Sequence, residues 1–502
     1  MKKSVLFVSF LIINFVANVS YAQINNEKDT VISPSNIKKG IRISYIITND
    51  QIEFLNTHFD FVETIFLDTN IRNKIQNPEL VLYRSIRSSW DNKPEFDWNY
   101  INSNENMFCH SDSATQDTST RIDIPEFDSW LMDGNDLVDS STADATNHWV
   151  NYFAVTASAQ VYNYNYDGLF IDEAGNKLSP GAVEGDMPWD YSPESWRDGR
   201  YRALSFIKSY LPDKTVIFNG LMAGNGADSS LSLTDGGMWE DFAYDIHDGS
   251  YKGKNRWLLA IQCMQRNHNN TNLVLVVKKL GLIDNIQARI FSIASYLLIS
   301  NPNIVFSMTD YTNHTNVQYY PEYDISIGNP LGDFTVNDDS VYLREFENGL
   351  VLVNPDADSS ITYVLPKEYH KIVPVGGGFV DSLGEYSGSL SYEPTSGQVT
   401  IPPESAVILK DSISSGIINM GNQSDIKVYP NPVKDYFIID LNNIDKISIK
   451  LYDMNGKIVF VKSEQQKQKI VINTSNLKAG NYILSVSNKK GQVIEAKKII
   501  KE

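Results

Sequence analysis

The hydrophobic pattern between Gly40 and about Phe306 alternates between short apolar runs and longer helical stretches. Short apolar runs bounded by turn residues are typical of buried parallel strands, and longer periodic stretches indicate the helices between them. Strands are predicted near 41–47, 59–65, 80–83, 166–173, 215–218, 237–239, 273–277 and 304–308, and helices near 49–57, 147–162, 196–210, 257–266 and 283–299. Eight strands alternating with helices over about 270 residues match a (β/α)8 barrel. We therefore expect an α/β fold with a TIM-barrel catalytic domain at residues 38–330.

After Asn329 the pattern changes to short strands separated by Gly, Pro and Asp turns. Apolar runs at 341–343, 349–353, 362–365 and 406–409 predict an antiparallel β-sandwich over residues 331–411. The Ser- and Gly-rich stretch at 412–426 is typical of a linker. Residues 427–502 alternate as strands around an Asn-Gly turn at 455–456, which predicts a small C-terminal β-sandwich.

The N-terminus has the pattern of a secretory signal peptide. Two lysines, Lys2 and Lys3, precede an apolar run from Val5 to Val16 that is too short to span a bilayer comfortably. Small residues at Ser20 and Ala22 place a cleavage point before Gln23. We expect residues 1–22 to be removed, and no other stretch has the length of a transmembrane helix.

Composition excludes some classes of partner. Hydrophobic residues make up 42% of the chain and charged residues 21%, which is ordinary for a folded protein. The net charge is -18, yet residues 427–502 contain 14 Lys, no Arg and 7 acidic residues, which leaves -25 for residues 1–426. This negative charge of residues 1–426 argues against nucleic acid or anionic lipid as the main partner.

The cysteines and histidines predict no metal or cofactor site. Cys109 and Cys263 are the two cysteines, and the sequence leaves open whether they pair in an exported chain. None of the 7 histidines lies at zinc-ligand spacing. His110, His247 and His314 are expected to be ordinary loop residues.

The segment from Tyr166 to Glu173 carries the strongest chemical signal. Its apolar core, Leu169 to Ile171, predicts a strand buried on both faces, and Asp172 and Glu173 follow directly. Carboxylates at this position are costly to desolvate unless they are paired or take part in chemistry. The C-terminal ends of barrel strands converge on one mouth, where catalytic residues lie.

The same rule applied to the other strands yields further candidates. They are Tyr45, Glu63, Asp68, Arg84, Arg87, Asn219, Trp239, Glu240, Asp241, Asp310 and Tyr311, together with Trp90 in the long excursion at about 86–145. The seventh strand ends in Lys278-Lys279 without an acid, which favours a nucleophile after the fourth strand and an acid after the sixth. Glycoside hydrolysis needs two carboxyl groups flanking the scissile bond, and Asp172 and Glu240 fit that need.

Each candidate also has an ordinary structural role open to it. Asp172 could cap the following loop, Glu240 could be a surface acid, and Asn219 precedes a glycine as turn residues do. Glu173 follows Asp172 directly, so in extended geometry its side chain points elsewhere, towards a pairing with Arg84 or Arg87. Trp90 and Trp239 could be core residues or platforms for a sugar ring.

Four stretches carry a family resemblance, which spans about residues 40–410. They are Trp130-Leu131-Met132-Asp133, the segment 166–173, Gly236-Gly237-Met238-Trp239-Glu240, and the run from Arg344 to Pro355. They resemble the barrel glycosidases of the alpha-galactosidase superfamily, especially the hypothetical glycoside hydrolase family 15 group, which is distinct from the glucoamylases. The resemblance implies Asp172 as the nucleophile and Glu240 as the general acid/base.

The tail carries a second resemblance. The stretches 428–435, 451–459, 477–484 and 497–502 resemble, in order, the type A C-terminal sorting domain of the type IX secretion system of Bacteroidota. The resemblance implies the secretion machinery as a partner, passage across the outer membrane, removal of the tail, and attachment to the cell surface or release.

We expect a secreted or cell-surface glycoside hydrolase that acts on an extracellular poly- or oligosaccharide without a cofactor. A polygalactosaminidase-like hydrolase of another glycan remains open, as does a non-catalytic glycan-binding protein on a barrel scaffold. A separation of Asp172 and Glu240 well beyond ~10 Å would favour binding without turnover. The residues expected to bind substrate are Tyr45, Asp68, Arg84, Arg87, Trp90, Glu173, Asn219, Trp239, Asp310 and Tyr311.

Overall fold

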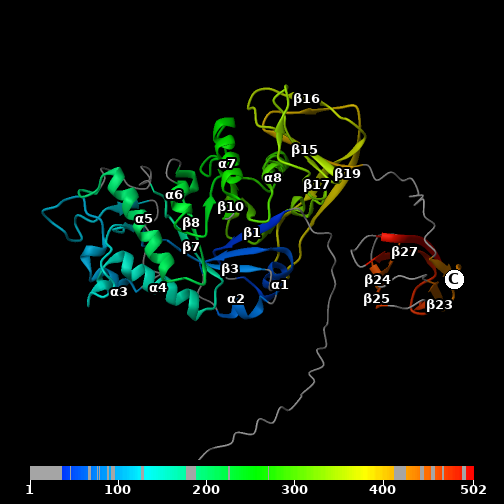
Figure 1. The fold of residues 1–502 in the computed structure, drawn as a ribbon, viewed down its shortest axis with the longest axis horizontal. Helices are drawn as coiled ribbons and strands as arrows, with labels where there is room; N and C mark the ends of the chain where they lie inside the picture. Colours follow the sequence, from blue (N-terminus) through cyan, green and yellow to red (C-terminus); the bar gives the residue numbers. More distant parts are fainter. Residues whose placement is uncertain are drawn as a thin grey trace, which may run out of the picture. The chain divides into compact units, whose positions relative to one another are not determined.

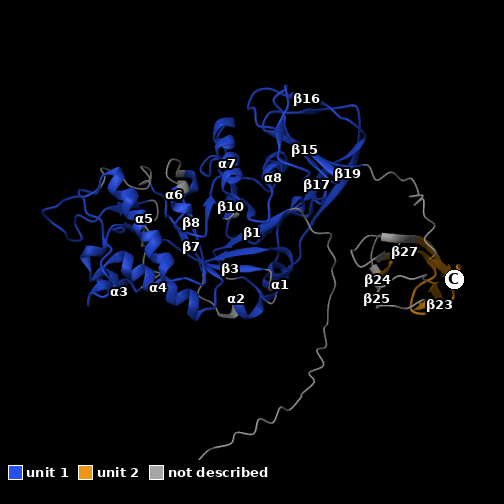
Figure 2. Ribbon diagram, viewed as in Figure 1, with its two compact units in different colours: residues 1–412 blue, residues 413–502 orange. Residues whose placement is uncertain are grey.

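The computed structural model describes residues 37–411 and 426–502, apart from short gaps at 46, 66–68, 76, 78–79, 88–89, 92–96, 126–128, 177–187, 224–226, 270, 441–445, 454–457, 466–468 and 489–492. The chain divides into two compact units, residues 1–412 and 413–502, which are coloured separately in Figure 2. The predicted signal peptide at 1–22, most of the predicted linker and the Asn-Gly turn lie outside the described residues.

The first unit contains a closed barrel of eight parallel strands, as the hydrophobic pattern predicts. Its strands, in the order in which they pair around the barrel, are β1 (Lys38–Ile43), β11 (Ile304–Asp310), β10 (Asn272–Lys279), β9 (Gly236–Trp239), β8 (Thr215–Asn219), β7 (Gly168–Asp172), β3 (Val81–Arg87) and β2 (Phe61–Thr64). Strands β1 and β2 pair from Gly40 with Phe61, and β1 closes on β11 from Lys38 with Val305. The TIM-barrel class is confirmed.

Helices surround this barrel, and local signals explain where they begin. They are α1 (Asn49–His58), α2 (Thr69–Lys74), α4 (Trp149–Asn163), α5 (Pro193–Ser209), α6 (Ala227–Leu231), α7 (Lys254–Asn267) and α8 (Ile286–Ile299). Helix α1 starts with a capping box in which Thr48 is the N-cap and the Gln51 side chain accepts a bond from the Thr48 backbone N–H. Ser192 caps α5, whose first residue is Pro193.

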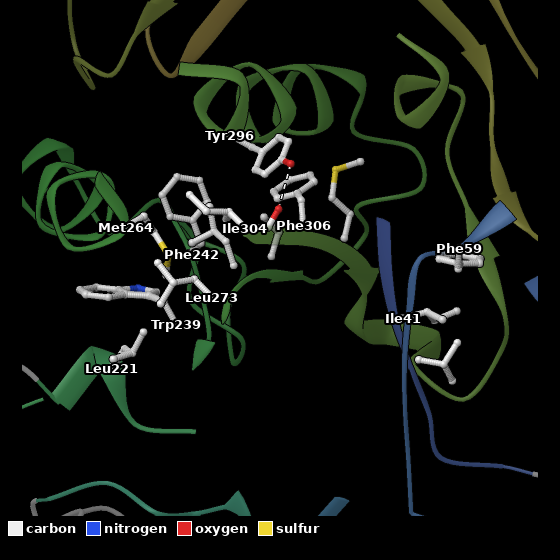
Figure 3. Close-up of a cluster of buried hydrophobic side chains, with 14 of the residues drawn as sticks. Ile41, Phe59, Leu221, Trp239, Phe242, Met264, Leu273, Tyr296, Ile304 and Phe306 are labelled. Carbon is white, nitrogen blue, oxygen red and sulfur yellow. Dashed lines mark hydrogen bonds between the residues drawn. The ribbon is translucent and has the colours of Figure 1, made fainter. Parts of the chain in front are cut away.

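Two apolar layers hold the barrel together. Inside it, side chains from the strands form one cluster: Phe61, Tyr83, Phe170, Ile217, Met238, Val274, Val276 and Val305. The larger cluster lies between the strands and the helices, and Figure 3 shows part of it, with Trp239, Phe242, Leu273 and Ile304 together. Since strand residues alternate between these layers, the apolar runs are buried on both faces.

Several barrel strands run further than the apolar pattern predicts. Strand β3 continues through Arg84 and Arg87, and β10 continues through Lys278 and Lys279. In both strands polar side chains near the C-terminal end replace apolar ones, so the apolar run ends before the strand does. These positions therefore alternate between the two faces of the sheet instead of lying in loops.

Between β3 and α4, the excursion has small elements of its own. They are β4 (Trp90–Asp91), α3 (Trp98–Asn102), β5 (Asp123–Ile124) and β6 (Ser129–Leu131), and the three short strands form one sheet in the order β4-β6-β5. Arg121 ties this region together through its guanidinium, which lies over the Phe108 ring and bonds to Glu105 and Asn102.

After the barrel come two antiparallel sheets that enclose a separate core. The larger has the order β13-β14-β15-β21-β17-β19 and the smaller pairs β16 with β20. Their bounds are β13 (Thr335–Val336), β14 (Tyr342–Phe346), β15 (Gly349–Asn354), β16 (Ile361–Val364), β17 (Tyr369–Gly376), β19 (Gly388–Thr395), β20 (Gln398–Ile401) and β21 (Ser405–Asp411), and a further two-residue strand, β18 (Gly378–Phe379), pairs with β12 (Gln318–Tyr319). The apolar pattern did not predict β17, β19 and β20, because their exposed polar, Gly and Pro residues interrupt it. The expected sandwich class is confirmed.

Helix α8 joins the barrel to these sheets. It contacts β14, β15 and β21, and Figure 1 shows it beside β15 and β17. Arg289 of α8 forms a fully buried ion pair with Glu322 (Nε to Oε1, 2.8 Å) and donates to the carbonyl of Gly376. Breaking such a pair would leave a buried charge, so it fixes the sheets on this helix.

The second unit has two antiparallel sheets of its own, β22-β23-β26 and β25-β24-β27-β28. Their strands are β22 (Lys427–Tyr429), β23 (Tyr436–Asp440), β24 (Lys446–Asp453), β25 (Ile458–Gln465), β26 (Lys469–Asn473), β27 (Gly480–Asn488) and β28 (Val493–Lys501). Phe437, Ile449, Leu451, Ile470 and Leu484 are buried between them.

The start of β7 requires glycine. A Cβ at Gly168 would collide with the Thr215 carbonyl oxygen and with the Tyr83 ring, both of which belong to neighbouring strands. We expect Gly168→Ala to lower the free energy of unfolding by about 1–3 kcal/mol, as overpacking does. Urea unfolding followed by tryptophan fluorescence measures this. Gly332→Ala is the matched control, because nothing lies within 4 Å of its added Cβ; equal losses in the two variants would contradict the prediction.

Candidate active site

A pocket of about 280 Å³ opens at the C-terminal mouth of the barrel. Apolar side chains of the inner core, among them Phe61, Met238, Val274 and Val276, line its floor. Its polar lining combines side chains from seven places in the barrel: Arg42, Ser44, Glu63, Arg87, Asp172, Glu173, Glu240, Lys278, Ser307, Thr309, Tyr311 and His314. The pocket therefore has an apolar floor and is surrounded by charged and polar side chains.

One side-chain amide joins the two predicted catalytic acids. Asn219 ends β8, and its Nδ2 donates to Asp172 Oδ1 at 2.9 Å and to Glu240 Oε2 at 2.7 Å. Asp172 is the last residue of β7, and Glu240 directly follows β9. Because one nitrogen makes both bonds, the two carboxylate oxygens lie no further apart than these bonds placed end to end. The structure thus brings Asp172, Asn219 and Glu240 together.

Two cations that the sequence analysis did not assign to the site complete the cluster. Arg42 on β1 pairs with Asp172 (Nη2 to Oδ2, 3.2 Å) and with Glu63 (Nε to Oε1, 3.4 Å). Lys278 on β10 forms an ion pair with Glu240 through Nζ and Oε1. Arg42 was missed because it lies inside a strand rather than after one. Lys278 lies at the end of its strand, where polar residues are candidates for the site. The sequence pattern was used there only to show that the strand ends without an acid, so the lysine itself was not predicted as a site residue.

Burial and the neighbouring cations shift the pKa values of these groups in different directions. Burial opposes ionisation of Asp172, but Arg42, the Asn219 amide and Lys278 together outweigh it, so the pKa of Asp172 is lowered. For Glu63 the balance is reversed: burial raises its pKa despite Arg42. Burial, and then Arg42, lower the pKa of Lys278 to about 8.

Glu173 lines the pocket, although its position after Asp172 predicted that it points elsewhere. Its φ of 53° lies in the left-handed region, so the chain turns and the simple alternation of an extended strand does not apply. Burial, and then the charge of Asp172, raise the pKa of Glu173 to about 8. Arg87, an expected neighbour, also lines the pocket, whereas Arg84 does not.

The other predicted substrate-binding residues divide into two groups. Tyr311 lines the pocket, with the Lys278 ammonium 5.4 Å from its ring centre. Arg84 instead is buried on the helix side of β3, where its Nε donates to Gln160 at 2.9 Å. Asp310 accepts bonds from the backbone N–H groups of Ile283 and Thr312, and so orders loops rather than lining the pocket.

Three aromatic candidates also lie outside the pocket lining or cannot be placed in it. Trp239 is a core residue, 4% exposed, and Figure 3 shows it among apolar side chains. Tyr45 is exposed beyond β1 but does not line the pocket. Trp90 pairs with Leu131 through its backbone, and its side chain lies outside what the structure describes, as does the whole of Asp68.

Cys109 and Cys263 are buried thiols in separate hydrophobic clusters, so no disulfide joins them. Within the described part of the chain, no group of three or more His, Cys, Asp or Glu side chains is arranged to hold a metal ion. In the same residues no helix is long and apolar enough to cross a membrane.

The comparison with known families agrees with a barrel that carries a pocket of paired carboxyl groups, as in glycoside hydrolases. Residues 88–350, more than half of the chain, match hypothetical glycosyl hydrolase family 15. The chain belongs to this family, and its barrel is a glycoside hydrolase domain. Residues 427–502 match the secretion system C-terminal sorting domain, which directs the protein to secretion or the cell surface.

Similarity to individual curated proteins is confined to short segments. An endo-acting ulvan lyase of Formosa agariphila is 37% identical over 79 residues, which cover 16% of this chain and 15% of that protein. Ulvan lyase NLR42 of Nonlabens ulvanivorans is 26% identical over 115 residues, 22% of each chain. The chain therefore spans less than a quarter of the length of either relative.

Solved structures with some likeness to this chain include several glycoside hydrolases. The glycoside hydrolase domain of PelA from Pseudomonas aeruginosa has a TM-score of 0.37 and 14% identity, over 54% of this chain and 95% of that one. A variant of the GH36 alpha-galactosidase AgaA from Geobacillus stearothermophilus has a TM-score of 0.36 and 10% identity, over 76% and 57% of the two chains. Likeness at this level says nothing about the residues of the pocket.

The Arg42 pairing has a testable cost. We expect Arg42→Met to lower the free energy of unfolding at neutral pH by about 3 kcal/mol, because two buried carboxyls lose their shared cation. Asp172 has a lowered pKa, so its contribution to stability is present above about pH 4 and is lost as the pH falls through its folded pKa. The gap between wild type and variant should therefore narrow on acidification.

Thermal unfolding of the two proteins at neutral and acidic pH measures this gap. Arg197→Met is the control, because Arg197 pairs with the neighbouring Asp198 on the surface and should cost less than about 1 kcal/mol. A gap that does not depend on pH would show that Arg42 acts through packing alone.

Proposed function

We propose that this protein is a secreted glycosidase that cleaves O-glycosidic bonds of an extracellular poly- or oligosaccharide, with Asp172 as nucleophile and Glu240 as general acid/base. The observation that supports this proposal best is the single Asn219 amide that donates to both carboxyl groups. Two carboxyl groups held at such a distance in one pocket are what glycoside hydrolysis requires.

Asp172 suits attack on an anomeric carbon. It is buried, and Arg42 and Asn219 both donate to it, so it is ionised and fixed in orientation without waiting for substrate. The backbone N–H of Glu173 donates to Asp172 Oδ1 at 3.0 Å and adds to this fixation. A fixed nucleophile loses little entropy on the way to the transition state.

Glu240 suits the second role through its two separate partners. Asn219 occupies Oε2 and Lys278 occupies Oε1, and both partners stabilise the carboxylate form. A carboxylate can activate water in the hydrolytic half of the reaction. To donate a proton in the first half, Glu240 must first take up a proton from solvent water and exchange the Lys278 contact for the glycosidic oxygen, which then receives that proton as the bond breaks.

The spacing also supports a retaining mechanism. Retaining enzymes hold their carboxyl groups about 5–5.5 Å apart and inverting ones about 6.5–9.5 Å. The two bonds through Asn219, 2.9 and 2.7 Å, keep the nearest oxygens of Asp172 and Glu240 closer together than the inverting range. The same spacing argues against a non-catalytic glycan-binding protein.

Asp172→Asn and Glu240→Gln each test the catalytic pair. We expect either variant to lower kcat by at least about 100-fold, the usual contribution of a nucleophile or an acid/base group, while the protein stays folded at the assay temperature. The measurement is reducing-sugar release from a polysaccharide panel by the mature 23–426 fragment. Asp123→Asn and Glu53→Gln are matched controls on exposed positions, and full activity of either pocket variant would refute the assignment.

The sorting domain makes a separate prediction. We expect a protein lacking residues 427–502 to remain on the periplasmic side of the outer membrane in a bacterium that has the type IX system, because the sorting domain is then absent. Fractionation with immunoblotting of cells and medium measures this. Export of the truncated protein at the normal level would contradict it.

A further inference from the structure

Glu173 combines backbone strain with a place in the pocket. The φ of Glu173 is 53°, a backbone conformation that is costly for residues other than glycine and that persists where the surroundings impose it. The same strained conformation occurs at Asp241, directly after Glu240. Both residues follow a proposed catalytic acid at the point where its strand ends.

Two backbone bonds hold Glu173 in this conformation. Its N–H donates to Asp172 Oδ1 at 3.0 Å, and its carbonyl accepts a bond from Arg200 Nη2 at 3.3 Å. Arg200 belongs to α5 and is buried, so its position is fixed by the helix layer. The strained turn therefore directs the Glu173 side chain into the pocket instead of towards the helices.

Charged groups face Glu173 from every side of the mouth. They are Asp172 of β7, Lys278 of β10, Arg42 of β1, Arg87 of β3 and Arg200 of α5, and the other titratable groups that line the pocket are Glu63, Glu240, Tyr311 and His314. Arg42 and Lys278 already form ion pairs with Asp172 and Glu240, respectively. Asp172 is thus the ionised member of the adjacent pair, and two neighbouring carboxyls in a desolvated site do not both ionise.

We propose that Glu173 is a substrate-positioning residue that stays an uncharged carboxylic acid and donates a hydrogen bond to a sugar hydroxyl next to Asp172. This inference rests on the proposed function for its substrate class. Asp172 and Glu240 are acceptors, so a neutral Glu173 adds a donor on the nucleophile's own side of the pocket. A site built to bond a particular hydroxyl discriminates against sugars that lack it, since the hydrogen bond to that hydroxyl is then lost.

The protonation state can be tested without any substrate. Infrared difference spectra between wild type and Glu173→Gln, taken from acidic to alkaline pH, should show a protonated carboxyl that is lost with a midpoint of about 8. In Asp172→Asn the midpoint should fall, because the adjacent negative charge is removed. A carboxyl that titrates in the ordinary range of glutamate overturns the proposal, whatever the activity.

The role is tested by the pH dependence of KM on the substrate that the polysaccharide panel identifies. In the wild type the donor is present below the Glu173 pKa and lost above it, so KM should rise about 5- to 10-fold on the alkaline side, the value of one hydrogen bond. Glu173→Gln keeps an N–H donor at every pH, so its KM should not show this rise. Glu173→Ala should show the high KM at every pH, with a smaller change in kcat.

Lys278 titrates in the same range, so Lys278→Arg is the control that separates the two groups. If the alkaline rise persists in Glu173→Gln and disappears in Lys278→Arg, the proposal is overturned in favour of the lysine. Retained activity in Asp172→Asn would refute the proposed catalytic pair. The infrared titration of Glu173 needs no substrate, so it tests the protonation state of Glu173 whether or not that pair is correct.

Discussion

The pairing of buried carboxyls with cations from other strands is the constraint on which the barrel mouth depends. Asp172, Glu63 and Glu240 all lie where water is largely excluded, and an isolated charge there would cost several kcal/mol. Arg42 serves Asp172 and Glu63, and Lys278 serves Glu240. Arg42 of β1 pairs with Asp172 of β7 although these two strands are not neighbours, so this pair forms only when the sheet curves into the barrel. The closed barrel then holds all three pairs in a defined geometry.

The apolar interior and this charged ring depend on each other. The inner cluster fills the barrel up to the level of Met238 and Val276, and the polar side chains begin directly above it. The low dielectric of that base opposes ionisation of both acids. Arg42, Asn219 and Lys278 nevertheless lower the pKa of Asp172, whereas burial and the Asp172 charge raise the pKa of Glu173 to about 8. Two adjacent residues thus hold different charge states, which is the division of labour that carboxylate chemistry uses. The left-handed turn at Glu173 brings both into one pocket.

Much of the architecture follows from local pattern. The apolar runs predicted the number of barrel strands and their alternation with helices, because each run must be buried on both faces. The prediction of strand ends failed where polar residues continue a strand. Strand β3 runs on to Arg87, which placed Arg84 outside the barrel and Arg87 in the pocket. In the sandwich, polar, Pro and Gly residues interrupt the apolar pattern of β17, and no residue of β19 is buried.

The sequence by itself determined the barrel, the sandwich, the sorting domain and the position of Asp172 at a strand end, because these depend on periodicity and motifs along the chain. The tertiary structure alone decided which polar residues meet. Asn219 joins Asp172 to Glu240, Arg42 lies 130 positions before its partner Asp172, and Trp239 turns into the core. The reason is that strand twist, register and the sign of one backbone angle decide where a side chain points, and these are settled when the strands pair around the closed barrel.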